Sequence, residues 1–313
     1  MCCAACVAVF AIRTADKSFH IPHHSLTPPP MRERIDTRAI GLDVGLSFIK
    51  WLTGAENLHY GLWDGLEVTA GNLRAAQDAY TTKLFKMLPD GPLRILDIGG
   101  GAGETARKLL ELGHSVDIVV PSAFLAQRCR ENAPTATVHE CMFEDLQVDK
   151  NFDLCLFSES FQYIPVNIAL KKAADHLDTN GEIIVSDCFR SEGFQRQKVG
   201  STVGGGHRIA NYRETLAAMP LTTVSEEDIT ASVAPSVDLE QALFNVFGHV
   251  ITRIDTELGQ KKRKTRWFIK RALSTVMSKR KRFRLHQRLM EKTRTAEHFK
   301  ANNVYLMIKL KPA

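Results

Sequence analysis

The chain has 313 residues, of which 44% are hydrophobic and 24% are charged, the balance of an ordinary globular protein. No apolar stretch approaches the ~20 residues that a membrane-spanning helix needs. The net charge of +6 is unevenly distributed, because residues 261–294 hold fifteen Lys and Arg side chains and one acid, Glu291, whereas the rest of the chain is acidic. Of the seven cysteines, the four that are well separated, Cys129, Cys141, Cys155 and Cys188, lack zinc-ligand spacing, which favours a reduced, cytoplasmic protein over a disulfide framework.

Residues 1–30 differ from the rest of the chain, with a short Cys/Ala/Val run followed by histidines and prolines. The apolar run has no basic flank, so it is a poor signal peptide. Three interpretations stay open: a disordered tail, a targeting tail that is acylated at Cys2, Cys3 or Cys6, and translation that starts at Met31. We expect this tail to have no part in catalysis.

Two helices are predicted first, at 32–52 and 69–87, on either side of an aromatic loop. Strands and helices then alternate. Strands are predicted at 93–98, 115–120, 137–139, 152–158 and 182–187, and helices at 104–112, 123–132 and 167–177. This alternation predicts an α/β protein with a doubly wound, mostly parallel sheet whose strands are joined by right-handed crossovers.

The last third of the chain is mostly helical. Helices are predicted at 211–219 and almost throughout 239–290, before a final strand at 304–310. We expect this helical insertion to act as a lid over the ligand-binding edge of the sheet. The predicted parts are a tail (1–30), N-terminal helices with an entry loop (31–90), a Rossmann-like core (91–190), a helical lid with the basic segment (191–300) and the final core strand (301–313).

The loop after the first predicted strand carries the clearest motif. Gly99, Gly101 and Gly103 alternate along it, which lets the backbone approach a ligand without Cβ clashes. The helix that follows offers free N–H groups at its start. The spacing is GxGxG and not the GxGxxG of dinucleotide sites, and Glu104 would repel a pyrophosphate. An NAD-binding protein is therefore the last of the alternatives.

The whole motif, Asp97-Ile98-Gly99-Gly100-Gly101-Ala102-Gly103, resembles motif I of the class I methyltransferases that depend on S-adenosyl-L-methionine (SAM), read there as D-x-G-x-G-x-G. Three further segments resemble the same family: 59–63 (an HYG-x-W entry of small-molecule methyltransferases), 143–146 beside the adenine, and 152–165 along the fourth strand. The resemblance covers roughly 58–187 and the final strand. It implies a seven-stranded Rossmann-like sheet and SAM as the cofactor; we expect no metal site.

The same resemblance implies roles for individual residues. Asp97 is expected to orient the loop and the amine of the cofactor. The expected cofactor-binding residues are Asp97, Gly99, Gly101, Gly103, Tyr60, Ser122, Met142, Phe143 and Ser158. Two positions depart from the family. Val120 stands where an acid usually bonds the ribose, so that Ser122 is the candidate hydroxyl there, and Met142 stands where an acid often precedes the adenine segment.

Methyl transfer from SAM is a direct displacement, for which an enzyme aligns the nucleophile and excludes water. Phenols and carbon acids gain more from a general base than amines do. We consider His207, His59 and Glu159 for proton removal or substrate orientation, each against a purely structural role. Three glycines before His207 suggest a mobile lid. The predicted reaction is methylation of an N, O or C nucleophile of a small molecule, with lipids and amines among the acceptors.

Two other functions stay open. The basic segment 261–294 also contains apolar side chains, which fits peripheral membrane contact, a solvated helix face or, less well, nucleic acid. An RNA methyltransferase is one alternative, although the loop 158–161 lacks the N/D-P-P-Y/F motif of base-amino methylation. A catalytically degenerate binding protein is the other, because of Val120 and Met142. The sequence predicts no particular oligomeric state.

Overall fold

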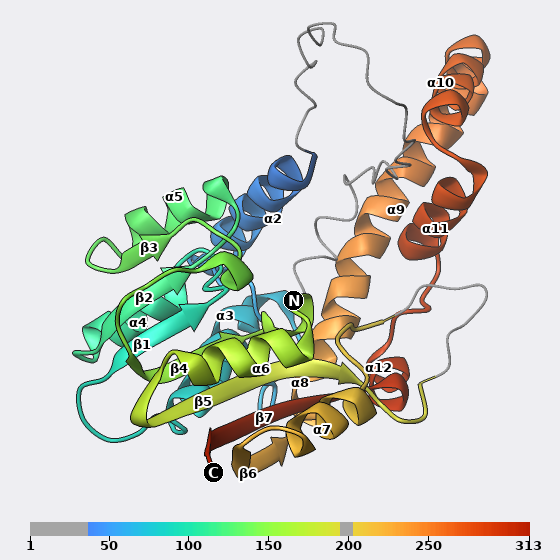
Figure 1. Cartoon of the computed structure of the whole chain (residues 1–313). Helices are drawn as coiled ribbons and strands as arrows, with labels where there is room; N and C mark the ends of the chain where they lie inside the picture. Colours follow the sequence, from blue (N-terminus) through green and yellow to red (C-terminus); the bar gives the residue numbers. More distant parts are fainter. Residues whose placement is uncertain (1–36, 195–202) are drawn as a thin grey trace, which may run out of the picture.

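A seven-stranded sheet forms the centre of the molecule, which a computed structural model describes at residues 37–194 and 203–313 (Figure 1). The predicted tail at 1–30 lies outside the described residues. The strand order is β3-β2-β1-β4-β5-β7-β6. The strands are β1 (Arg94–Ile98), β2 (Ser115–Val119), β3 (Thr137–His139), β4 (Phe152–Ser158), β5 (Leu177–Arg190), β6 (Leu221–Asp228) and β7 (Asn303–Pro312). Strands β1 to β5 pair in parallel, and β7 is antiparallel to β5 and β6, which confirms the predicted seven-stranded, mostly parallel sheet.

Helices cover both faces of this sheet. The helices before the insertion are α2 (Thr37–Thr53), α3 (Leu73–Phe85), α4 (Glu104–Glu111), α5 (Ala123–Asn132), α6 (Val166–Asp175) and α7 (Ile209–Ala217), with 3-10 turns η1 (Ala70–Asn72), η2 (Phe143–Asp145) and η3 (Phe161–Tyr163). One hydrophobic cluster joins the sheet to α3, α4 and α5, and a second joins it to α6 and α7. Because both faces are buried, the central strands are nearly continuous apolar runs.

Most predicted elements lie within a few residues of the observed ones, and the two larger differences have physical reasons. Strand β6 was not predicted, because all but its first residue are exposed and its sequence has no apolar alternation. The stretch 239–290, predicted as helical almost throughout, is divided into three helices. The breaks come where Lys262 adopts φ −140° and where Ser278 caps a new helix.

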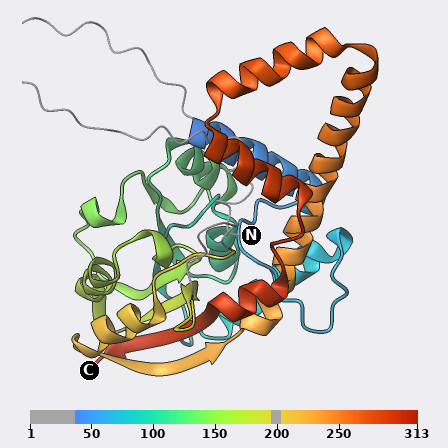
Figure 2. The same ribbon diagram turned by 90° about the vertical axis from the view of Figure 1, so that its right-hand side faces the viewer.

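The insertion between β6 and β7 projects from the core, as Figures 1 and 2 show. It contains α8 (Thr230–Val233), α9 (Pro235–Lys261), α10 (Arg263–Val276), α11 (Lys279–Met290) and α12 (Ala296–Asn302). We call α9 to α11 the helical arm. Phe244 of α9 packs on Leu289 of α11, whereas α10 has no buried residue. In the described part of the chain, no helix has the length and apolar character to cross a membrane.

Candidate functional site

The glycine loop connects β1 to α4 at the carboxyl edge of the sheet, where ligands bind in open α/β folds. Gly101 adopts a left-handed conformation, with φ +57°. A Cβ built there meets only Leu58 Cδ1, at 3.7 Å, so there is space over the loop. Gly99 and Gly103 lie instead against Ser160 and helix α5, which leaves no room for larger side chains. The loop is thus packed on its sides and open at its centre.

Asp97 lies at the start of this loop and is almost fully buried. Its Oδ2 atom has no hydrogen-bond partner among the described residues. Burial raises the pKa of the Asp97 carboxyl to about 7. A cationic group brought near this carboxylate would favour its ionised form. The acid expected from the motif is therefore present, and its environment fits a ligand ammonium group better than a second anion.

We call residues 56–63 the entry segment. Hydrogen bonds join it both to the start of α4, next to the glycine loop, and to Glu159, directly after β4. The Glu56 backbone N–H donates to Glu104 Oε1 at 3.0 Å, at the first turn of α4. Four residues later, the Tyr60 N–H donates to Glu159 Oε1 at 2.8 Å. Between these two bonds, Leu58 approaches Gly101. The entry segment therefore lies beside the open centre of the loop.

The Glu56 side chain fixes one end of the entry segment and was not predicted as a site residue. Burial opposes its ionisation, but hydrogen bonds from Arg128, Lys50 and Asn132 outweigh this and lower the pKa of Glu56 to about 2. Arg128 contributes two of these bonds, at 2.6 and 2.9 Å. The glutamate thus ties α2 and α5 to the entry segment.

The other end of the entry segment rests on the root of the helical arm. The Trp63 indole N–H donates to Ser236 Oγ at 2.8 Å, and the Gly61 N–H donates to the same oxygen at 3.1 Å. Ser236 lies in the first turn of α9. The root of the insertion therefore contacts the entry segment, and its action as a lid stays a prediction.

Glu159 follows directly after β4 and has an uncommon backbone conformation. Its φ is +57°, which costs a non-glycine residue roughly 1–3 kcal/mol and occurs mainly at functional sites. Its Oε1 atom accepts hydrogen bonds from the Tyr60 N–H and the Tyr305 hydroxyl, both at 2.8 Å. Both of these hydrogen bonds are to Oε1, and no described hydrogen bond or ion pair involves Oε2. One carboxylate oxygen is thus fixed, and the other is available.

A row of hydroxyl groups extends from Glu159 into the core. Tyr305 and Tyr80 are 2.9 Å apart at their hydroxyl oxygens, and Tyr80 is 2.6 Å from Ser186 Oγ. Because Tyr305 donates its proton to Glu159, Tyr80 must donate to Tyr305 and Ser186 to Tyr80. Burial raises the pKa of both tyrosines, and the charge of Glu159 raises it further. Both phenols are therefore neutral donors at neutral pH.

A second buried carboxyl lies near this row, at Asp187 of β5. It accepts hydrogen bonds from the Gln162 backbone N–H at 3.0 Å and the Gln162 amide at 2.9 Å. Burial raises the pKa of Asp187 to about 8, and the nearby charge of Glu159 contributes. The edge of the sheet thus gathers three carboxyl groups, Asp97, Glu159 and Asp187, and a cationic ligand there would favour their ionised forms.

His59 is buried in the entry segment. Its Nδ1 atom donates to the Tyr60 carbonyl at 2.8 Å, and its Nε2 atom is 3.4 Å from Thr81 Oγ1. The ring stacks on Tyr80 with centroids 4.6 Å apart. Burial lowers the pKa of His59 to about 3, so the ring is neutral at neutral pH. This environment fits orientation of the entry segment better than proton removal.

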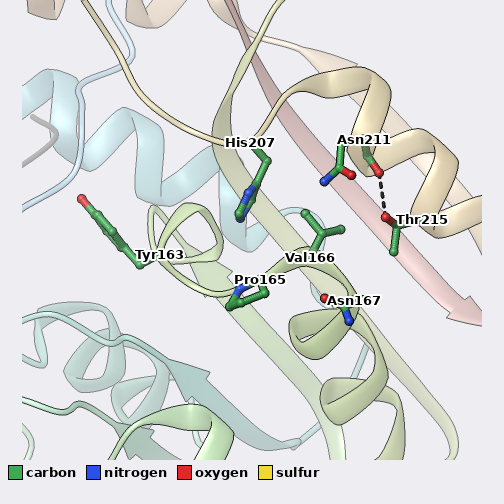
Figure 3. Close-up of a pocket in the computed structure, with 7 residues that line it drawn as sticks. All are labelled: Tyr163, Pro165, Val166, Asn167, His207, Asn211 and Thr215. Carbon is green, nitrogen blue, oxygen red and sulfur yellow. Dashed lines mark hydrogen bonds between the residues drawn. The ribbon is translucent and has the colours of Figure 1, made fainter. Parts of the chain in front are cut away.

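His207 lines a cavity of about 460 Å³ between η3, α6 and α7 (Figure 3). The cavity residues are Tyr163, Pro165, Val166, Asn167, His207, Asn211 and Thr215. The His207 Nε2 atom donates to the Ile164 carbonyl at 2.8 Å, which leaves Nδ1 as the remaining ring nitrogen. The cavity does not include the glycine loop, and we place the candidate site at the loop, because the open glycine and the buried acid lie there.

The glycines before His207 serve close packing. A Cβ at Gly206, where φ is +89°, would overlap the carbonyl oxygen of Cys188. Gly204 and Gly205 similarly face the side chains of Asn303 and Gln162. These contacts account for the glycines at 204–206, and a mobile lid here stays a prediction.

The segment expected to flank the adenine begins at the turn η2, after β3. Phe143 is buried and packs edge-on against Phe157, with ring centroids 5.9 Å apart. Met142 is exposed, and Ser158 lies at the end of β4 close to Tyr80. A contact of Phe143 with the adenine, and of Met142 and Ser158 with the cofactor, stays a prediction.

The expected ribose position is apolar. Val120 is buried, and Asp117 is engaged elsewhere, with His139 at 2.6 Å and Lys150 at 2.7 Å. Ser122 accepts a hydrogen bond from the first turn of α5, so its hydroxyl acts as a helix cap. The ribose hydroxyls therefore have no carboxylate partner at the usual place. Within 37–194 and 203–313, no group of three or more metal-ligating side chains gathers.

The strand order, the glycine loop and the buried acid together define the class I SAM-dependent methyltransferase fold. Residues 95–181 match the family model of a methyltransferase domain. This part of the chain is therefore similar to a methyltransferase domain, and the fold around it is that of class I SAM-dependent methyltransferases. A comparison of the sequence with curated proteins found no match.

Three solved structures illustrate the range of proteins with this fold. Geranyl diphosphate C-methyltransferase from Streptomyces coelicolor A3(2), in complex with S-adenosyl-L-homocysteine, is 15% identical, with a TM-score of 0.59 over 85% of this chain and 92% of that one. A putative sarcosine dimethylglycine methyltransferase from Galdieria sulphuraria is 18% identical, with a TM-score of 0.55 over 84% and 96%. The (4+2)-cyclase SpnF is 15% identical, with a TM-score of 0.62 over 88% and 95%. At these identities the likeness concerns the fold alone.

Proposed function

We propose that this protein transfers a methyl group from SAM to an N, O or C nucleophile of a small molecule. The observation that carries the proposal is Glu159, held in a left-handed conformation beside the glycine loop with one carboxylate oxygen fixed and the other available. Methyltransferases of known structure with this fold support the reaction class. A lipid or an amine is among the acceptors that we propose.

The residues of the loop fit the cofactor. Asp97 is a buried, unpaired carboxyl that suits an amine, and Gly101 leaves space for a ligand on the loop. We propose Tyr60, Met142, Phe143, Ser158 and the hydroxyl of Ser122 for the remaining contacts. When bound, SAM supplies an electrophilic methyl group on a sulfonium centre.

We propose that Glu159 Oε2 accepts the proton of the nucleophile or orients a cationic acceptor. The two hydrogen bonds to Oε1 stabilise the carboxylate and fix its direction, and positioned bases of this kind contribute typically 10²–10⁴-fold to a rate. The entry segment and the root of the arm would exclude water from this edge. His207 is a second candidate, through Nδ1, for an acceptor that enters from the cavity beside it.

Two glycine variants test the cofactor site. Gly101→Ala and Gly113→Ala both place a side chain at a left-handed position, with φ +57° and +89°, and neither meets a close neighbour. Each therefore costs a similar backbone strain of about 1 kcal/mol. By isothermal titration calorimetry, we expect SAM affinity to fall at least about tenfold only in Gly101→Ala. Equal affinities in the two variants would refute the assignment of the loop.

The acceptor is found by incubation of the wild-type protein with radiolabelled SAM and a cell extract, followed by identification of the labelled product. A labelled small molecule supports the proposal, and a labelled RNA would favour the alternative that uses the basic segment 261–294. Absence of SAM binding at millimolar concentration would favour a binding protein without methyl transfer.

A further inference from the structure

Helix α10, at the tip of the helical arm, is amphipathic and has no buried residue. Its apolar side chains recur at the spacing of one helix face: Phe268, Ile269, Ala272, Leu273 and Val276. Phe268 is 72% exposed and Val276 is 65% exposed. A contiguous exposed apolar face of this kind marks an interaction surface in a globular protein.

The ion pairs of α10 decide which way this apolar face points. Arg266 and Lys270 pair with Asp255 of α9 at 2.5 and 3.3 Å. The side of α10 that carries these two residues is thereby held against α9, and Phe268, two positions from each, lies on the opposite side of the helix. Figures 1 and 2 both place α10 at the end of the arm farthest from the sheet.

The charge around this face is strongly positive. The segment 261–294 contains fifteen basic side chains and one acid, Glu291. The described ion pairs bring only Asp255, Glu257 and Glu240 to it from elsewhere in the chain. Lys264 and Arg271, which take part in none of the described ion pairs, lie on α10 itself. An apolar stripe flanked by basic side chains complements the acyl chains and anionic headgroups of a lipid surface.

We infer that α10 docks the protein on an anionic membrane surface. Phe268, Leu273 and Val276 enter the boundary between headgroups and acyl chains, and the flanking Lys and Arg side chains contact lipid phosphates. A nucleic acid would satisfy the charges but would leave the apolar face in water, so the membrane accounts for both features. The inference concerns the arm alone and does not depend on the proposed methyl transfer.

Co-sedimentation of the full chain with phosphatidylcholine vesicles, with and without about one-third phosphatidylserine, tests the inference. We expect binding mainly to the anionic vesicles. Phe268→Ser/Leu273→Ser should weaken it by about tenfold or more, because it removes two apolar anchors and no charge. Lys264→Gln/Arg271→Gln should weaken it by roughly fivefold for each charge removed. Since α10 packs on no core residue, all these variants should fold, which circular dichroism verifies.

The matched control is Ile168→Ser/Val224→Ser, which removes two exposed apolar side chains from α6 and β6. It should bind vesicles as the wild type does. Equal loss in this control, or no vesicle binding by the wild type, would overturn the inference. If Phe268→Ser/Leu273→Ser bound vesicles normally while Lys264→Gln/Arg271→Gln lost both vesicles and a single-stranded oligonucleotide, the arm would be a polyanion-binding surface instead.

Discussion

The edge of the sheet and the tip of the arm are built on opposite principles. At the edge, Glu56, Trp63 and Glu159 are fixed by specific hydrogen bonds, and Asp97 is a buried acid whose Oδ2 atom has no partner among the described residues. At the tip, α10 has no buried residue, and its position depends on ion pairs with Asp255. The difference indicates that the edge is prepared for a small ligand of defined shape, and that the tip is suited to a broad surface recognised by charge and apolar contact.

The largest effect concerns the buried acid of the edge. The raised pKa means that folded Asp97 holds its proton between pH 4 and about 7, where the unfolded side chain is ionised. The unfolding free energy therefore falls as pH rises through this window, by about 1.4 kcal/mol for each unit that the pKa is raised. Asp97→Asn should remove this part of the pH dependence and also weaken SAM binding. Urea unfolding of both proteins at pH 4 to 8 measures how the unfolding free energy depends on pH.

Asp178→Asn is the control for that experiment. Hydrogen bonds with Arg94 lower the pKa of this exposed carboxyl, so its variant should leave the loss of stability toward neutral pH in place. The same slope in Asp97→Asn and the wild type would mean that Asp97 is not a buried, unpaired acid.

The root of the helical arm should be stabilised by specific buried contacts, as the edge of the sheet is, and not by exposed ion pairs, as the tip is. Arg294 pairs with Glu240 at 2.8 Å, and both side chains are almost fully buried. Arg294→Met leaves a buried carboxylate uncompensated, which costs about 3 kcal/mol or more. The exposed pair of Lys171 and Asp175 gives the comparison, since Lys171→Met should cost less than about 0.5 kcal/mol. If chemical denaturation showed that both variants lose a similar unfolding free energy, the buried pair at the root would contribute no more stability than the exposed pair.

A substitution of Glu159 tests whether this side chain accepts the proton of the nucleophile at the edge of the sheet. Glu159→Gln keeps the shape of the side chain and removes its capacity to accept a proton, so we expect kcat to fall about 100-fold with little change in SAM affinity. Glu140→Gln, an exposed residue paired with Arg130, is the matched variant and should retain full turnover. Unchanged kcat in Glu159→Gln would restrict this residue to a structural role.

His59 should give the smallest effect. Its ring is neutral and engaged by the Tyr60 carbonyl, so His59→Gln should change kcat by less than about threefold near neutral pH and leave the pH–rate profile intact. A loss of the acid limb of that profile would show that the imidazole takes part in proton transfer.

The sequence was sufficient for features that depend on local patterns. Glycine spacing and a leading acid located the loop at 97–103, and alternating apolar runs located the parallel strands, because both signals lie within a few consecutive residues. Strand β6 was not predicted, because it is exposed along nearly its whole length. Its pairing with β7 depends on backbone hydrogen bonds, which side-chain patterns do not record.

The contacts that build the site could not be predicted from local sequence patterns, because they join residues far apart in the chain. Tyr305 reaches Glu159 from a strand 146 positions away, and Arg128 reaches Glu56 across 72 positions. A buried tyrosine near the end of a chain has no local signature of such a role. The glycines at 204–206 do have a local signal, but it is ambiguous, since mobility and close packing favour the same residue type.

The backbone of Glu159 sets stability and activity against each other. Its left-handed conformation is one that glycine adopts without strain, so Glu159→Gly would gain from relief of the native strain. The same change removes the carboxylate that Tyr60 and Tyr305 hold. In a library selected only for thermal stability, glycine should become frequent at this position. In a library selected for turnover, glutamate should persist, and the two enrichments would measure how much stability this chain gives up for its chemistry.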